Sequence, residues 1–130
     1  MIRLFLAVTP AALLLAVSIF VLMTVNGFAC DRIGNVSWYG KESCISSPCR
    51  TRSGETFTGR DLTAAMIGTQ HIGEHWRATS LATGRSVTVR VNDTGGFAKF
   101  GRAMDLSKAA FARIAPLGQG TAKVCMERVG

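Results

Sequence analysis

The sequence predicts a small, mainly β domain that closes into a barrel. The chain has 130 residues, and those after the apolar first 29 contain short alternating or β-branched segments separated by Gly-rich turns. About six such strands and one short helix fit into the roughly 100 residues that remain, which suffice for one compact core. Closure of a small sheet into a barrel also removes its unpaired edges.

The first 29 residues predict a targeting segment. Arg3 is the only charged residue among them, and an apolar run extends from Leu4 to Val25. Gly27 and Ala29 are small residues where a signal peptidase requires them, before Cys30. A run of about 20 residues is also long enough to remain as a membrane anchor, and lipid attachment to Cys30 is a third alternative. Each alternative predicts an exported domain over 30–130, periplasmic or in the cell envelope, with anchoring to the inner membrane as one of the alternatives, and any contact with the membrane is expected only through the N-terminal segment.

Four cysteines agree with export, because all of them follow the targeting segment and their number is even. Such cysteines in a small exported domain predict two disulfides. Four cysteines allow three pairings, and we favour Cys44–Cys49 with Cys30–Cys125, since the other two would cross-link the central loop to a chain end. The spacing does not match the usual zinc ligand patterns, so no metal is expected.

Strands are expected at six places along the exported part: 35–40, 62–66, 76–81, 86–93, 103–106 and 121–129. The 86–93 segment has the clearest pattern, with valines at every second position. A turn at 82–85 joins it to the preceding strand as a hairpin. Ser107 is the expected N-cap of a helix over 108–115. Residues 41–54 form a polar loop.

The charge of the exported part indicates an anionic partner. It has 14 basic and 8 acidic residues, a net charge of about +6. The basic residues are scattered and form no nucleic-acid-binding motif, so nucleic acid is not expected as a partner. Nucleotide and metal motifs are absent, and we expect a monomer without a cofactor. A cell-wall polymer and a membrane surface remain the candidate anionic partners, and the alternative is a solvated surface with a positive bias and no anionic partner.

Three of the eight carboxylates have a context that points to chemistry. Glu55 lies in the polar loop after Ser53-Gly54, Asp93 ends the 86–93 strand beside a Gly-rich loop, and Asp105 interrupts an apolar strand at its end. For Asp105 the alternative is a structural role in binding the amides of the following helix. The other carboxylates, Asp31, Glu42, Asp61, Glu74 and Glu127, are expected to be surface or loop charges.

Three aromatic residues are candidates for sugar binding. The rings of Trp38, Tyr39 and Trp76 have the size and flatness to stack on sugar rings in a groove, although each fits core packing equally well. His71 lies in the loop that leads into the strand containing Trp76.

Six segments, taken together and in this order, resemble one family. The resemblance is to the rare lipoprotein A (RlpA)-like domain, a six-stranded double-psi β-barrel with one short helix, and it spans about residues 34–129. The segments are Val36-Ser37-Trp38-Tyr39-Gly40, Arg52-Ser53-Gly54-Glu55, Leu62-Thr63-Ala64-Ala65, Gly84-Arg85-Ser86-Val87, Val89-Arg90-Val91-Asn92-Asp93 and Gly101-Arg102-Ala103-Met104-Asp105-Leu106-Ser107.

The resemblance implies a lytic transglycosylase of peptidoglycan. Such an enzyme cuts the bond from N-acetylmuramic acid to N-acetylglucosamine without water and leaves a 1,6-anhydro end. Asp105 would be the general acid/base, and Glu55 and Asp93 would orient the sugar or stabilise positive charge at its anomeric carbon. The residues expected to bind the glycan strand are Trp38, Tyr39, His71, Trp76, Arg90 and Asn92.

The chain departs from the family pattern at two positions. Thr58 stands where the family usually has an Asp, and Met66 stands where it usually has a His. His71, in the loop that follows, is a candidate replacement for that His. Two other functions therefore stay open: a non-catalytic, expansin-like barrel that binds cell-wall glycan, and a disulfide-stapled interaction domain such as an inhibitor.

Overall fold

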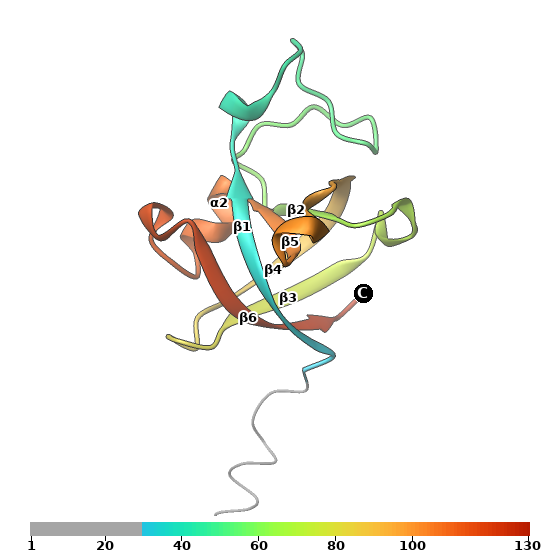
Figure 1. Ribbon diagram of the computed structural model, residues 1–130. Helices are drawn as coiled ribbons and strands as arrows, with labels where there is room; N and C mark the ends of the chain where they lie inside the picture. The colour runs from blue at the N-terminus through green and yellow to red at the C-terminus, as the bar shows by residue number, and fades with distance from the viewer. Residues whose placement is uncertain (1–29) are drawn as a thin grey trace, which may run out of the picture.

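The computed structural model describes residues 30–130, which form six strands, one short α-helix and four 3-10 helices (Figure 1). The predicted targeting segment, residues 1–29, lies outside the described residues. Within 30–130 no helix has the length and apolar character to cross a membrane. The strands are β1 Arg32–Tyr39, β2 Thr63–Met66, β3 His75–Ser80, β4 Ser86–Thr94, β5 Arg102–Ser107 and β6 Thr121–Arg128; the α-helix is α2 Lys108–Ala112; the 3-10 helices are η1 Lys41–Ser43, η2 Thr69–His71, η3 Phe97–Phe100 and η4 Leu117–Gln119.

The six strands close into a barrel in the order β1-β5-β2-β4-β3-β6. β1 runs parallel to β5 and β2 runs parallel to β4, whereas the other neighbours are antiparallel. The predicted mainly β, closed architecture is therefore confirmed, including the β3–β4 hairpin. The two parallel pairs join strands that are far apart in the sequence.

The barrel interior follows the predicted alternation. Val87, Val89 and Val91 of β4 are buried, at 5%, 1% and 0% exposure, while the residues between them face outward. Helix α2 lies against the barrel, and Phe111 and Ile114 are fully buried beneath it. This packing gives the short strands a rigid frame on which the site is built.

The helix is shorter than expected, ending at Ala112 instead of residue 115. The next two amides bond three residues back, as the Arg113 N–H does to the Ala110 carbonyl, so the helix tightens into turns ahead of Pro116. The predicted cap is confirmed: the Ser107 hydroxyl oxygen accepts the Ala110 N–H at 3.2 Å. β1 begins three residues earlier than predicted, at Arg32, because it pairs with β6 from Met126 onward.

Both disulfides join the pairs favoured from the sequence, Cys30–Cys125 and Cys44–Cys49. The first attaches the start of the described chain to β6. The second lies in residues 40–60, which project from one end of the barrel between β1 and β2 (Figure 1). We call residues 40–60 the projecting segment. Phe57 anchors this segment, since it is 3% exposed and stacks on Tyr39 with ring centroids 4.5 Å apart.

Candidate active site

Two carboxylates face one cavity at the end of the barrel that carries the projecting segment. The cavity has a volume of about 190 Å³ and is lined by Tyr39, Ala65, Asp93, Thr94, Gly95, Phe97 and Asp105. Its geometry follows from strand register: Ala65 in β2 pairs with Asp105 in β5 on one side and with Asp93 in β4 on the other. Neighbouring strands lie about 4.8 Å apart, so the two aspartate backbones are roughly 10 Å apart with a single methyl group between them.

Asp105 is held by a serine and an arginine. The Ser37 hydroxyl donates a hydrogen bond to Asp105 Oδ1. Arg102 Nη2 donates to Oδ2 at 3.4 Å, and Arg102 Nε forms an ion pair with Oδ1 at 3.2 Å. The carboxyl side chain is 15% exposed, so it faces the cavity from a partly buried position. The Ser107 side chain accepts the Ala110 N–H at the start of helix α2. The helix is therefore capped by Ser107, and not by Asp105 as the structural alternative for Asp105 supposed.

Asp93 is fixed by three donors. Its Oδ1 accepts the backbone N–H groups of Arg52 and Thr94, each at 2.9 Å, and its Oδ2 accepts the Tyr39 hydroxyl at 3.3 Å. The Arg52 amide belongs to the projecting segment. Asp93 therefore connects that segment to the barrel while presenting its carboxylate to the cavity.

Tyr39 reaches over the cavity toward both aspartates. Burial raises the pKa of its hydroxyl, and the negative charges of Asp93 and Asp105 raise it further. The phenol consequently stays protonated and acts as a hydrogen-bond donor to Asp93. Its ring is supported from the projecting segment by Phe57.

Glu55 lies in a second cluster, on the outer face of β4. Arg90 donates to both of its carboxylate oxygens, at 2.5 and 2.8 Å, and Asn92 Nδ2 donates at 3.4 Å. The hydrogen bonds from Arg90 lower the pKa of Glu55 to about 2. Glu55 is thus a permanent negative charge near neutral pH, and it does not line the Asp105 cavity. The structure brings the predicted residues Glu55, Arg90 and Asn92 together. This cluster is separate from the cavity that Asp93 and Asp105 line.

Two of the three predicted stacking residues point away from the cavity. Trp38 packs against the core, its indole N–H donates to the Leu117 carbonyl at 3.0 Å, and Lys108 lies over its ring at 5.7 Å. Alternation along β1 explains this, because Trp38 faces opposite to Ser37 and Tyr39. Trp76 is 9% exposed and belongs to the core cluster.

His71 also lies outside the cavity lining. Its Nδ1 is 2.8 Å from Glu74 Oε2, which also accepts the Trp76 indole N–H at 2.9 Å. The expectation that Glu74 is a plain surface charge is wrong, since its side chain is 13% exposed and also pairs with Arg128. Burial by itself raises the pKa of Glu74, but the hydrogen bonds from His71 and Trp76 outweigh it and the pKa is lowered. Met66, which stands where the family usually has a His, is buried at 2% exposure.

Ser37 and Arg102 are functional candidates that residue-by-residue reading of the sequence missed. Ser37 meets Asp105 because the two are in register across the parallel β1–β5 pair. That pairing joins residues 68 apart in the sequence, and no local sequence pattern predicts it. Arg102 stands three residues before Asp105, a spacing that carries no signal in a strand. Among residues 30–130, no group of three or more His, Cys, Asp or Glu is placed to hold a metal ion.

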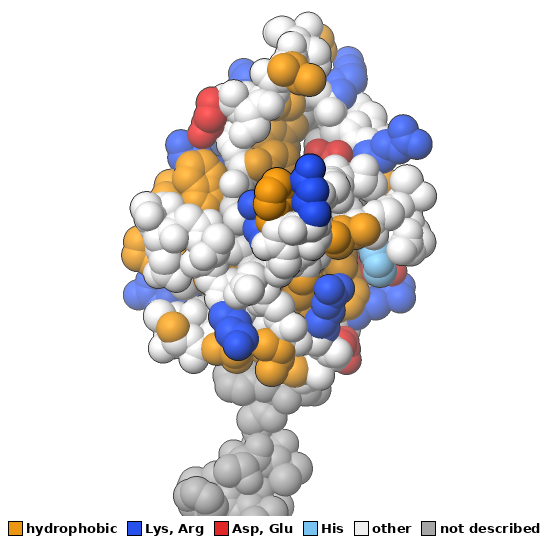
Figure 2. All heavy atoms as spheres, viewed as in Figure 1, with side chains coloured by type: hydrophobic (Ala, Val, Ile, Leu, Met, Phe, Trp, Pro, Cys, Tyr) orange, Lys and Arg blue, Asp and Glu red, His pale blue; other side chains and the backbone are white. Residues whose placement is uncertain are grey.

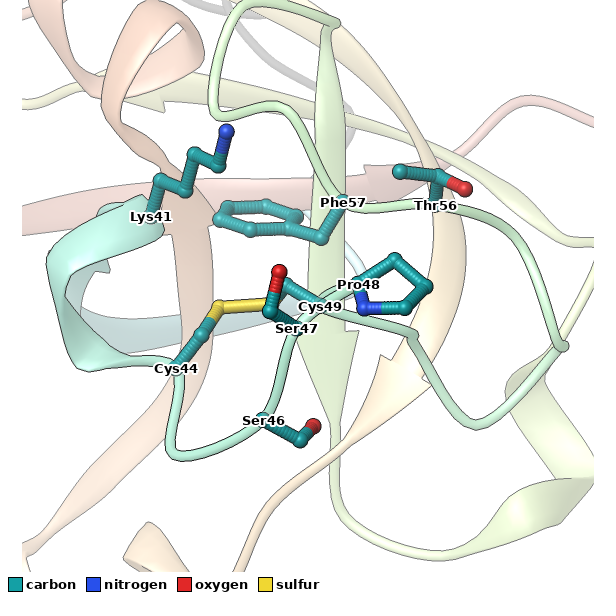
Figure 3. Close-up of a pocket in the computed structure, with 8 residues that line it drawn as sticks. All are labelled: Lys41, Cys44, Ser46, Ser47, Pro48, Cys49, Thr56 and Phe57. Carbon is teal, nitrogen blue, oxygen red and sulfur yellow. A yellow bond between two sulfur atoms is a disulfide. The ribbon is translucent and has the colours of Figure 1, made fainter.

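The projecting segment extends the hollow beyond the two aspartates. A cavity of about 200 Å³ is bounded by Tyr39 and Asp93 on the barrel and by Ile45 and Arg50 on the segment. A further cavity of about 320 Å³ lies around the Cys44–Cys49 disulfide and Phe57, with Lys41 at its edge (Figure 3). Figure 2 shows hydrophobic side chains in the hollow below the projecting segment and basic side chains on both sides of it. The site is therefore part of a longer groove.

Comparisons with known proteins agree with this architecture. The model of a family described as "Lytic transglycolase" matches residues 31–126. The endolytic peptidoglycan transglycosylase RlpA of Campylobacter jejuni is 40% identical over 97 residues, which are 75% of this chain and 34% of that protein. The chain thus spans about a third of the length of the curated relatives it matches.

Two solved structures share the fold at low identity. An expansin of Clavibacter michiganensis has a TM-score of 0.59 at 18% identity, covering 75% of this chain and half of the expansin. A Streptomyces papain inhibitor has a TM-score of 0.59 at 19% identity, covering 79% of this chain and 99% of the inhibitor. These likenesses concern the fold alone. Because the family model covers most of the chain, and because relatives 40% identical over this region carry the RlpA name, the chain belongs to the lytic transglycolase family of RlpA-like double-psi β-barrels.

Proposed function

We propose that this protein is an exported lytic transglycosylase that cleaves peptidoglycan glycan strands at the cavity between Asp105 and Asp93. The observation that carries the proposal is the pair of partly buried carboxylates facing one cavity, at the end of a groove. Family membership and relatives named as endolytic peptidoglycan transglycosylases support it.

In this proposal Asp105 is the general acid/base. Protonated Asp105 gives its proton to the glycosidic oxygen of the leaving N-acetylglucosamine as the bond from C1 of N-acetylmuramic acid breaks. The 6-hydroxyl oxygen of the same muramic acid then bonds to C1, and its proton passes to the Asp105 carboxylate. The 1,6-anhydro end forms without water, and Asp105 returns to its starting form.

The neighbouring residues have distinct supporting roles. Arg102 and Ser37 keep the Asp105 carboxyl group in one orientation toward the cavity. Asp93 places a negative charge on the other side of Ala65, where it can stabilise positive charge at the anomeric carbon. Tyr39 holds Asp93 in that position. Glu55 with Arg90 and Asn92 lies on the β4 side, where it would bind sugar groups beyond the cleaved bond.

The two disulfides indicate an exported protein, since such bonds persist outside the reducing cytoplasm. We further propose that residues 1–29 are a signal peptide or membrane anchor and that residues 30–130 are the working domain in the periplasm or cell envelope. The basic charge of that domain suits an anionic wall polymer.

A non-catalytic glycan-binding barrel is the second candidate. The observation that favours it is that neither departure supplies an ionisable side chain: Met66 is apolar and buried, and Thr58 donates its hydroxyl hydrogen bond to Asp61. His71 is engaged by Glu74. Under this alternative the groove would bind glycan strands without cutting them.

The distinguishing experiment incubates the purified, oxidised protein with intact peptidoglycan and with glycan strands stripped of their peptides. Soluble fragments are identified by mass spectrometry, where an anhydro end is one water lighter than a hydrolysed end. We expect anhydro-ended fragments from at least one substrate. Co-sedimentation with the wall and no soluble fragment from either substrate would instead identify the binding barrel.

A further inference from the structure

The aromatic residues predicted to stack on sugar rings do not present a freely accessible ring, and another aromatic residue does. Trp76 is packed into the core, Trp38 is half-buried against the core with Lys108 over its ring, and Tyr39 is covered by Phe57 on one side. An accessible flat aromatic surface stabilises a bound sugar ring by stacking on its apolar face. Among the large hydrophobic residues that are exposed within residues 30–130, Phe100 is the aromatic one, at 65% exposure.

Phe100 is held close to the proposed acid/base. It ends the 3-10 helix η3, one residue before Gly101 turns the chain into β5 with φ of +72°. The Arg102 guanidinium lies 5.3 Å from the Phe100 ring centroid and 5.7 Å from that of Phe97. The same guanidinium binds Asp105. A single side chain therefore connects the exposed ring to the carboxylate.

The helix η3 that presents the exposed Phe100 ring is anchored at its other end by a buried residue. Phe97, at the other end of η3, is 4% exposed and lines the cavity that contains Asp93 and Asp105. Lys99 lies 5.1 Å over the Phe100 ring, but it is an exposed lysine on a flexible stem and can move aside.

We propose that Phe100 is a sugar-binding platform: the apolar face of a pyranose ring of the glycan strand stacks on it in the subsite next to Asp105. This inference rests on the proposed function. Flat aromatic surface buried against a ligand contributes both apolar area and geometric specificity, at little cost in side-chain entropy. The platform fixes one sugar unit at a set distance from Asp105, and thus defines which glycosidic bond reaches the carboxyl group.

The test measures binding of peptide-free glycan strands to proteins carrying Asp105→Asn, which prevents cleavage during the measurement. To this parent we add Phe100→Ala, Phe100→Trp or, as the matched control, Leu81→Ala. Leu81 is an apolar residue of comparable exposure, 46%, beside the β3–β4 turn. Thermal unfolding of each variant checks the fold.

We expect Phe100→Ala to weaken binding about tenfold, Phe100→Trp to restore it and Leu81→Ala to leave it unchanged. With Asp105 intact, Phe100→Ala should raise KM and leave kcat within about twofold. Equal binding by the parent and Phe100→Ala would overturn the platform and leave the proposed function standing. Failure of the parent itself to bind glycan would overturn both. Loss of a concentration-dependent dimer in Phe100→Ala, with unchanged glycan binding, would show that the ring serves self-association instead.

Discussion

Asp105 and Asp93 pair with opposite sides of the same residue, Ala65, across three adjacent strands. The side chain between them is a methyl group that is itself 4% exposed. A cavity of about 190 Å³ remains above it, flanked by the two carboxylates. The room for a sugar ring between the two charges thus depends on one small residue.

Ala65→Leu should therefore abolish activity without unfolding the protein. The added methyl groups would fill the floor of the cavity and cost about 1–3 kcal/mol by overpacking. Ala65→Gly keeps the cavity open and is the control, with a cost of about 0.5–1 kcal/mol for a glycine in a strand. Fragment release and thermal unfolding measured on both variants test this; full activity of the leucine variant would place the reacting sugar elsewhere.

Tyr39 is the only tyrosine in the chain, so its ionisation can be followed directly by ultraviolet absorbance. Burial and the charge of Asp93 raise its pKa above the ordinary value of 10.0. We expect no tyrosinate signal from the folded protein as pH rises past 10, and a signal only when the protein unfolds. Because the unfolded chain ionises first, the stability that the neutral phenol supplies is complete below pH 10 and is lost above it. A normal titration in the folded state would contradict the placement of Tyr39.

Glu55 should influence stability in acid but should not act as the proton donor. Arg90 lowers its pKa from 4.5 to about 2, so the stability it contributes is present above pH 4.5 and is lost as pH falls toward 2. Glu55→Gln should flatten the dependence of the melting temperature on pH across that window. At neutral pH the variant should keep measurable activity, lowered by weaker substrate binding. Complete loss of product with normal glycan binding would assign Glu55 a direct chemical role.

The two disulfides should differ in their contribution to stability. Cys30–Cys125 joins residues 95 apart, whereas Cys44–Cys49 joins residues 5 apart. On chain entropy alone the longer loop contributes about 4–5 kcal/mol and the shorter about 2 kcal/mol. Denaturant unfolding of the two double-serine variants measures this order. Removal of Cys44–Cys49 should lower activity more than its effect on stability explains, because that bond shapes the wall of the groove.

The barrel could be predicted from the sequence because its strands have local patterns. The alternating valines of β4 and the capping Ser107 depend on near neighbours, and both were predicted correctly. The site depends on pairings between distant segments. Ser37 meets Asp105, and Asp93 meets the amide of Arg52, only after β1 has paired with β5 and the projecting segment has packed on the barrel. For the same reason the sequence could not separate Tyr39, which faces the cavity, from its neighbour Trp38, which faces the core.

The most direct test of the account compares the wild-type protein with Asp105→Asn on peptidoglycan, with Glu42→Gln as the control for an exposed carboxylate on the projecting segment. The asparagine retains the shape of the side chain and can still accept the Ser37 hydrogen bond, so the fold should persist, but it cannot donate and recover a proton. We predict anhydro-ended fragments from the wild-type and Glu42→Gln proteins and none from Asp105→Asn. Anhydro-ended fragments from Asp105→Asn at the wild-type rate would contradict the assignment of Asp105 as the acid/base.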